Sequence, residues 1–277
     1  MGVLHVVATP IGNLEDVTLR ALRVIGECEL LLAEDTRRVR KLLDRHQLKA
    51  RPLSLHAHNE VGRAARVIAV LEQGGEVALV SDAGTPLISD PGERLVQAVL
   101  EAGHEVRAVP GPSAALAALS VAGLSAERFT FIGFLPRKAG ARAALLARLA
   151  EAPETLLFFE SPSRLAATLV ELAERLGPRR ACVARELTKL HEEAARGSLP
   201  ELAERFAEGT RGEVTLVVEG RDEAPEPVDA TALDEEIGAR LAAGESAKQI
   251  SSDLARPGLP RREVYARVIA LRERPVD

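Results

Sequence analysis

Two polar loops contain the residue types that bind small ligands, and each follows an apolar stretch typical of a strand. Residues 8–16 read ATPIGNLED, and residues 81–92 read SDAGTPLISDPG, with two aspartates, two prolines and two glycines. Glycine lets backbone N–H groups approach a ligand, and a carboxylate can pair with a cation or take a proton. We therefore expect a small-ligand site here. The alternatives are that 8–16 is an ordinary strand-to-helix turn and that Asp90 only caps the next helix.

Further polar clusters follow other predicted strands, and their joint placement is more informative than any one of them. They are residues 34–37 (EDTR), 110–114 (PGPSA), 159–164 (FESPSR) and 185–189 (RELTK). Open α/β sheets bind ligands at the carboxyl ends of their strands. If two such sheets face a common cleft, all these groups line it. Neither G-x-G-x-x-G after the first strand nor the P-loop motif occurs, which disfavours a dinucleotide dehydrogenase or a P-loop NTPase.

The elements that position these loops alternate between strand and helix in the first half of the chain. Apolar periodicity predicts strands at 4–9, 29–33, 76–81 and 105–109, with helices at 17–26, 36–46, 59–73, 92–102 and 113–122. Such βαβ alternation predicts a mainly parallel sheet covered by helices. We expect this first α/β domain to occupy residues 1–115.

The second half repeats the scheme and ends in a different kind of unit. We predict strands at 129–134, 155–159, 181–185 and 213–219, with helices at 141–150, 163–176 and 199–207, in a second α/β domain at 116–220. Residues 221–230 are acidic and contain proline, as linkers do. Three amphipathic helices at 233–241, 246–254 and 260–271 predict a small all-α domain at 231–277, with the last two resembling a helix-turn-helix pair around the turn at 256–259.

Composition narrows the class of protein. No apolar run reaches the roughly 18 residues of a membrane span, so we expect a soluble, cytoplasmic protein. Cys28 and Cys182 have no partner at metal-ligand spacing and lie beside apolar runs, which favours reduced, buried thiols. The net charge of −5 argues against a uniformly cationic surface but allows a local basic one.

The loops, taken together, resemble one known family. In order and spacing, TPIGNLEDVT, AEDTR, SDAGTPLISDPG, VPGPSA, GFLPRK, FFESPSRL, ARELTK and GEVTLVVEG are similar to the ribosomal RNA small subunit methyltransferase I family of the tetrapyrrole methylase superfamily, over residues 3–220. The superfamily's first loop is G-x-G-P-G-D. Here Gly12 and Asn13 occupy its last two positions, and Thr9 and Pro10 replace earlier small residues. This departure separates the chain from corrin and porphyrin methylases and leaves open which first-loop groups touch the cofactor.

The resemblance implies a homodimer that binds S-adenosylmethionine between its two α/β domains and methylates the ribose 2′-hydroxyl of a cytidine in small-subunit ribosomal RNA, naked or assembled. It implies no DNA or membrane partner. The cofactor contacts that follow from the matching motifs are Thr9, Pro10, Gly12, Asn13, Asp82, Ala83, Gly84, Thr85, Pro86, Pro112, Ser113, Ala114, Phe159, Glu160, Arg185, Glu186 and Thr188.

A hydroxyl is a poor nucleophile, so we expect a base to accept its proton. The acidic candidates are Asp82, Glu186, Glu160 and Asp35, with Asp82 or Glu186 favoured; Lys189 is a further cleft residue. In-line methyl transfer otherwise needs alignment and exclusion of water.

Cationic and polar side chains near the predicted site or on the C-terminal helices are candidates for RNA contacts. They are Arg37, His56, His58, Arg137, Lys138, Arg142, Lys189, Arg261 and Arg262. The 136–142 loop could equally be solvated, and the C-terminal helices could stabilise a dimer instead of binding RNA. His56 and His58 could share a metal but lack a third ligand, so we expect no metal site.

Two other functions stay open at this point. One is a methylase that uses the same cofactor on a tetrapyrrole-like small molecule, and the other is a non-catalytic RNA-binding factor for ribosome assembly. Cofactor binding separates the second from both enzymes.

Overall fold

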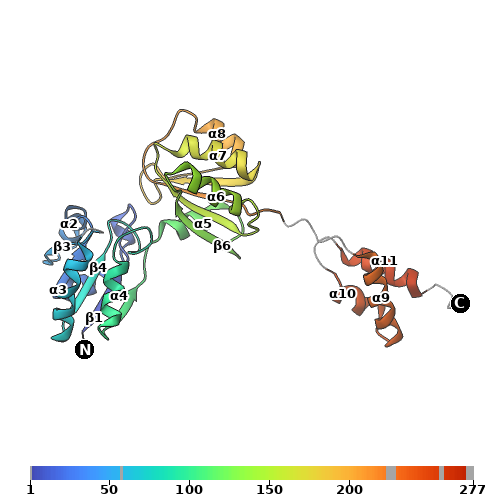
Figure 1. Ribbon diagram of the computed structural model, residues 1–277, viewed down its shortest axis with the longest axis horizontal. Coiled ribbons are helices and arrows are strands. Elements are labelled where there is room, and N and C mark those ends of the chain that lie inside the picture. Colours follow the sequence, from blue (N-terminus) through green and yellow to red (C-terminus); the bar gives the residue numbers. More distant parts are fainter. Residues whose placement is uncertain (1, 57–58, 223–228, 256–258, 273–277) are drawn as a thin grey trace. The chain divides into compact units, whose positions relative to one another are not determined.

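A computed structural model describes residues 2–56, 59–222, 229–255 and 259–272. The chain forms two compact units, residues 1–221 and 222–277 (Figure 1). The larger unit contains two five-stranded sheets, and the smaller one contains helices only. The fold class predicted from the sequence, two α/β sheets followed by an all-α segment, is therefore confirmed. The division of the larger unit near residue 115 stays a prediction.

The first sheet is parallel throughout, as predicted. Its order is β3(Pro52–Ser54), β2(Leu30–Ala33), β4(Glu76–Val80), β1(Val3–Val7), β5(Glu105–Val109). Successive side chains of a strand point to opposite faces. On β2, Leu31 and Ala33 accordingly pack with α1(Leu19–Glu27) and α2(Thr36–Arg45), whereas Leu30 and Leu32 pack with α3(Glu60–Glu72) and α4(Glu93–Glu101). Helices thus cover both faces, and the polar loops are left at the carboxyl edge.

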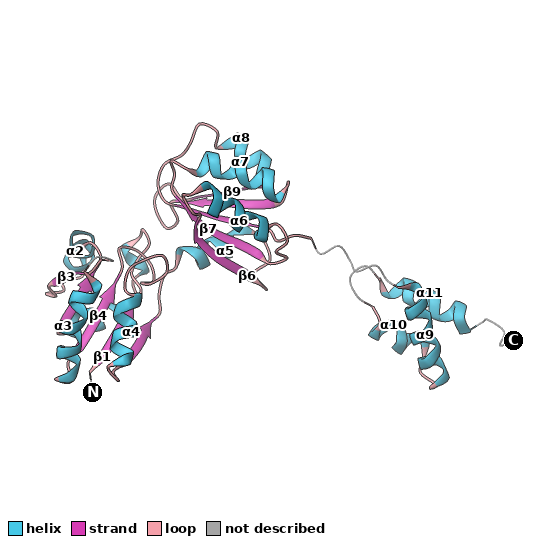
Figure 2. Cartoon of the chain, in the orientation of Figure 1, coloured by secondary structure: helices cyan, strands magenta, loops and turns pink. Residues whose placement is uncertain are grey.

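The second sheet differs from the prediction. Its order is β6(Phe129–Phe134), β7(Thr155–Glu160), β10(Val214–Val218), β8(Arg180–Arg185), β9(Glu193–Ser198), and only β6 and β7 are parallel neighbours. The expectation of a repeated parallel scheme is therefore wrong, because β10 lies antiparallel between β7 and β8. One face is covered by α5(Ala114–Ala122) and the other by α6(Ala139–Leu149), α7(Leu165–Leu176) and α8(Leu199–Arg205) (Figure 2).

The smaller unit has its own core. Three helices, α9(Ala230–Ala242), α10(Ala247–Asp253) and α11(Arg261–Arg272), bury Leu233, Ile237, Ile250, Leu259, Val264 and Val268. The three-helix prediction is confirmed. Residues 256–258 of the predicted helix-turn-helix turn lie outside the described residues.

The cysteines and the helices bear on two expectations drawn from composition. Cys28 and Cys182 are both free thiols; Cys182 is buried, and burial raises the pKa of the half-buried Cys28 to about 11. Among the described residues, no helix combines the length and the apolar character that a membrane span needs.

Candidate active site

Three loops at the carboxyl edge of the first sheet are tied to one another by hydrogen bonds. The backbone N–H of Thr9 donates to the carbonyl of Gly84 at 2.8 Å, and the Gly84 N–H donates back at 3.0 Å. Gly84 has φ +79°, a conformation that favours glycine. The Thr85 hydroxyl donates to the carbonyl of Pro112 at 3.3 Å. The loops after β1, β4 and β5 therefore form one connected surface.

The loop after β8, in the second sheet, touches this surface. The N–H of Asn13 donates to Thr188 Oγ1 at 3.0 Å. A Cβ added to Gly12 would lie 2.5 Å from Lys189 Cγ and 2.8 Å from Thr188 Oγ1, so only glycine fits there. Loops of the two sheets thus meet, as the proposed common cleft requires.

Unfavourable backbone conformations are concentrated in these loops. Among the described non-glycine residues, five have positive φ, and four of them lie in the loops after β4 and β8: Leu87, Ser89, Glu186 and Thr188. Each such residue costs on the order of 1 kcal/mol and persists only where the surrounding structure holds it. Strain of this kind is characteristic of functional loops.

A cavity of about 350 Å³ lies where the loops meet. This volume falls within the range of about 300–1,000 Å³ typical of small-molecule sites. The first sheet contributes Ile11, Ala83, Gly84, Thr85, Ile88, Ser89, Asp90, Ser113 and Ala114 to its lining. The second sheet and its loops contribute Phe134, Phe159, Glu160, Ser161, Pro162, Ala184, Leu187, Gly212, Glu213, Val214 and Thr215. We call this space the main cavity.

The charged and aromatic side chains of the main cavity suit a cationic ligand that has a flat apolar part. Its lining has three carboxylates, from Asp90, Glu160 and Glu213, and no Lys, Arg or His. Phe134 and Phe159 lie with their ring centroids 5.8 Å apart and provide aromatic surface. A sulfonium and an amino group would find acids here, and a purine would find aromatic rings, so the lining fits S-adenosylmethionine.

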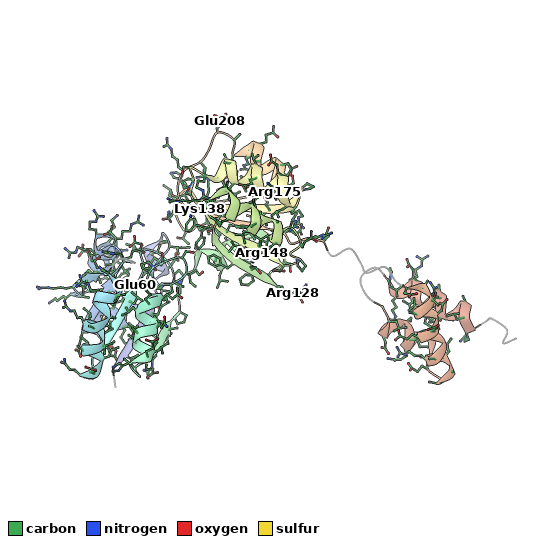
Figure 3. All side chains as sticks on the ribbon, in the orientation of Figure 1. Glu60, Arg128, Lys138, Arg148, Arg175 and Glu208 are labelled. Carbon is green, nitrogen blue, oxygen red and sulfur yellow. The ribbon has the colours of Figure 1, made fainter. Side chains whose placement is uncertain are left out.

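Asp90 is a lining residue that sequence reasoning treated as a possible helix cap. That alternative is wrong, since Gly92 is the N-cap of α4. The N–H groups of Gly92 and Arg94 instead donate to the buried carboxylate of Glu60, each at 3.1 Å (Figure 3 labels Glu60). Burial raises the pKa of Asp90 to about 6, and the charge of Asp82 adds to this, while a hydrogen bond from Ser81 opposes it.

Glu160 is the one predicted proton acceptor in the lining. Its side chain is 1% exposed, and it accepts hydrogen bonds from the Ser161 N–H and the Thr168 hydroxyl, both at 2.7 Å. Arg164 lies 3.5 Å from the same carboxylate. These partners hold the carboxylate in a fixed position at the cavity wall.

The other three acidic candidates are placed outside the lining. Asp82 accepts from the Asp35 N–H at 2.8 Å and pairs with Arg38 at 3.3 Å. Hydrogen bonds from Arg37 lower the pKa of Asp35 to about 2. A hydrogen bond from Lys189 lowers the pKa of Glu186, whose carboxylate also accepts from the Glu213 N–H. All three carboxylates therefore bond to neighbouring loop residues outside the main cavity lining.

The predicted cofactor residues divide in the same way. Ala83, Gly84, Thr85, Ser113, Ala114, Phe159 and Glu160 line the main cavity. The remainder belong to the connected loops but not to its lining: Thr9, Pro10, Gly12, Asn13, Asp82, Pro86, Pro112, Arg185, Glu186 and Thr188.

Several predicted RNA contacts are used inside the fold. Arg142 pairs with Glu171 at 2.6 Å and donates to two carbonyls, and Lys189 pairs with Glu186 and Glu213 at 2.7 and 2.9 Å. Arg37 is exposed but paired with Asp35 at 2.7 Å. Four others are exposed at the start of α6 or α11: Arg137, Lys138, Arg261 and Arg262 (Figure 3 labels Lys138).

A second cavity of about 520 Å³ lies beside the main one and shares Ser89 and Asp90 with it. Its other lining residues are Glu34, His56, Glu60, Pro91, Gly92, Glu93 and Arg94. Burial raises the pKa of Glu34, and the charges of Asp90 and Asp82 add to this. His58 lies outside the described residues, which contain no cluster of metal-binding side chains.

Comparisons with known proteins agree with this geometry. The profile of the family described as Tetrapyrrole (Corrin/Porphyrin) Methylases matches residues 3–203. A protein of Mesorhizobium japonicum named ribosomal RNA small subunit methyltransferase I is 43% identical, covering 98% of this chain and 92% of the relative. One of the same name from Thermotoga maritima is 45% identical over 80% of this chain and 100% of the relative.

Solved structures show the same fold. The uroporphyrin-III C-methyltransferase of Thermus thermophilus, solved with S-adenyl homocysteine, is 21% identical with a TM-score of 0.56, covering 78% of this chain and 97% of that one.

Proposed function

The chain belongs to the tetrapyrrole (corrin/porphyrin) methylase family, and we propose that it transfers a methyl group from S-adenosylmethionine to the ribose 2′-hydroxyl of a cytidine in small-subunit ribosomal RNA. The observation that carries the proposal is the similarity to methyltransferases of that name along nearly the whole chain. The main cavity supports it, because the charged groups of its lining are all carboxylates, which suit a cationic cofactor. A cytoplasmic homodimer is part of the same proposal.

The main cavity would hold the cofactor through backbone and carboxylate groups. When bound, S-adenosylmethionine supplies a methyl group on a positively charged sulfur. An oxygen nucleophile can attack the methyl carbon, with the sulfur as the leaving group. The backbone of 83–85 and 113–114 would position the ligand, since small side chains there leave N–H and C=O groups accessible. Asp90 and Glu213 would face its positive charges.

We take the group that removes the ribose proton to be a carboxylate at the cavity wall. Of the four predicted candidates, Glu160 meets this condition, so we place it ahead of Asp82, Glu186 and Asp35. The lowered pKa values of Asp35 and Glu186 make those carboxylates weaker bases.

Methylation of ribosomal particles tests the proposal. Small ribosomal subunits and their naked RNA, from a strain that lacks this activity, would be incubated with the protein and isotopically labelled S-adenosylmethionine. Mass spectrometry of the digested RNA should find a 2′-O-methylcytidine at one position. Label incorporated into uroporphyrinogen III but not into RNA would instead identify a small-molecule methylase, and cofactor binding without transfer to either would contradict both.

A further inference from the structure

Helix α2 carries a concentration of positive charge that neither the fold nor the main cavity requires. In a chain with net charge −5, its ten residues TRRVRKLLDR include four arginines, one lysine and a single acid, Asp44. All five cationic side chains are exposed, whereas Val39, Leu42 and Leu43 are buried against the sheet. The helix is therefore held by its apolar side and presents cations to solvent.

Two of the five cations have partners at the start of the helix. Arg37 pairs with Asp35, and Arg38 pairs with Asp82. Arg40, Lys41 and Arg45 form no ion pair with any residue that the structure describes. At helical spacing, 37, 41 and 45 follow one another along the exposed side of the helix, 40 lies on the other side of 37, and the exposed Asp44 lies between 40 and 41. We call the side chains of Arg40, Lys41 and Arg45 the α2 basic face.

The α2 basic face belongs to a helix that begins at the two cavities. Glu34, two residues before α2, lines the second cavity. The N-cap Asp35 donates its N–H to Asp82, which directly precedes the lining residues 83–85 of the main cavity. A polyanion bound along α2 would therefore extend away from the cavity loops, starting at Arg40, about 6 Å along the helix from Thr36.

Building on the proposed function, we propose that the α2 basic face binds the phosphate backbone of the RNA beside the nucleotide that is methylated. Arginine suits this role because its planar guanidinium donates two parallel hydrogen bonds to phosphate oxygens. Most of the charged side chains that line the two cavities are acids, so the cavities would repel phosphates and leave them on α2. An anionic lipid surface is the alternative, and the test separates it from RNA.

The test compares two double variants that each remove two exposed positive charges. Arg40→Gln/Lys41→Gln alters α2, and the control Arg148→Gln/Arg175→Gln alters the ends of α6 and α7 (Figure 3 labels Arg148 and Arg175). Binding of a labelled single-stranded RNA of about 20 nucleotides would be measured between about 50 and 200 mM salt. Each phosphate contact contributes about 0.7 to the salt slope.

We expect the α2 variant to bind the RNA about tenfold more weakly near 0.1 M salt, with a salt slope shallower by about 1.4. The control should match the wild-type protein, and both variants should keep wild-type affinity for S-adenosylmethionine by calorimetry. An unchanged slope in the α2 variant would overturn the inference. So would loss of binding to phosphatidylglycerol vesicles without any loss of RNA binding.

The inference and the proposed function fail in distinguishable ways. Wild-type methylation of small ribosomal subunits together with an unchanged α2 slope overturns the inference and leaves the function standing. A salt slope that becomes shallower in the α2 variant, together with no methylation of any RNA, supports the α2 basic face as an RNA-binding surface and contradicts the proposed reaction.

Discussion

At the scale of single residues, carboxylates of the same unit differ in acidity because of what surrounds them. Asp35 lies beside the Arg37 guanidinium, and its pKa falls to about 2. Asp90 loses water at the wall of two cavities, and its pKa rises to about 6. Hydrogen bonds from a cation favour the ionised form, and desolvation disfavours it. Of these two acids, Asp90 therefore has a charge that depends on pH near neutrality.

Removing the Asp90 carboxylate should weaken cofactor binding. We expect Asp90→Asn to bind S-adenosylmethionine about 10- to 100-fold more weakly, since a hydrogen bond to a charged group contributes about 1.5–3 kcal/mol. Bound cation favours the ionised carboxylate, so wild-type affinity should also fall as the pH drops from 7 to 5, through the pKa of about 6. Calorimetry at several pH values measures both effects. Equal pH dependence in wild type and Asp90→Asn would contradict this assignment.

Glu160 should affect the reaction more than binding. We expect Glu160→Gln, which keeps the size of the side chain, to hold cofactor affinity within a few fold and to lower the single-turnover methylation rate about 10²- to 10⁴-fold. Asp82→Asn is the comparison, because Asp82 lies outside the main cavity lining. Normal turnover in Glu160→Gln would exclude it as the proton acceptor.

The sequence was informative about single residues where local chemistry dominates. The glycines and prolines of 81–92 and 110–114 predicted the loops that supply Ala83, Gly84 and Ser113. Ile88, Asp90 and Phe134 were missed as lining residues. Tertiary packing decides that the side chains of Ile88 and Phe134 face the main cavity. Asp90 was interpreted as a possible helix cap because it lies just before a predicted helix, so its position at the two cavities was missed.

At the scale of elements, the antiparallel direction of β10 changes the composition of the site. The carboxyl ends of β6, β7 and β8 lie at one edge of the second sheet, and the amino end of β10 lies at that same edge. Gly212, Glu213, Val214 and Thr215 consequently line the main cavity. A parallel β10 would have placed them at the opposite edge, so the expected βαβ scheme could not have found them.

The missed strands have identifiable causes. β9 (EAARGS) lacks apolar alternation, and β3 is a three-residue edge strand that begins with proline. Pairing with the preceding strand decides both, β8 for β9 and β2 for β3, and the apolar pattern of the short strand itself does not record it. The elements with strong periodicity, such as α3 and β4, were predicted within about one residue of their ends.

Two glycines beside β10 give a matched test of crowding near the site. Gly209 and Gly212 have φ of +82° and +89°, so alanine is strained at both positions, at a cost of about 1 kcal/mol. An added Cβ at Gly209 meets nothing within 4 Å, whereas at Gly212 it lies 2.3 Å from the Glu186 carboxyl. We expect Gly212→Ala, but not Gly209→Ala, to weaken cofactor binding, with both variants measured by calorimetry and thermal unfolding. Equal affinities in the two variants would show that the Glu186 contact does not reach the cavity.

At the scale of the whole molecule, the two compact units have separate cores. We call residues 1–221 the methylase unit and residues 222–277 the helical unit. Among the described residues, the buried core of α9–α11 is formed by side chains between 233 and 268. The Thermotoga maritima relative matches this chain along its full length while covering 80% of it. About a fifth of this chain therefore has no counterpart in that relative. Because the helical unit has its own core and contributes no residue to the lining of the main cavity, we expect α9–α11 to contribute to binding or assembly.

Truncation after Arg221 should separate the two contributions. We expect residues 1–221 to unfold cooperatively, with a melting temperature within a few degrees of that of the full chain, and to bind S-adenosylmethionine with unchanged affinity, because both sheets and every residue of the main cavity lie in this unit.

The same truncation distinguishes the two roles expected for α9–α11. If Arg261 and Arg262 on α11 contact RNA, the truncated protein should bind small ribosomal subunits more weakly, and Arg261→Gln/Arg262→Gln in the full chain should reproduce the loss. If α9–α11 instead stabilise a dimer, sedimentation should show dissociation of the truncated protein while the double variant stays dimeric. A truncated protein that no longer binds cofactor would show that the methylase unit depends on the helices.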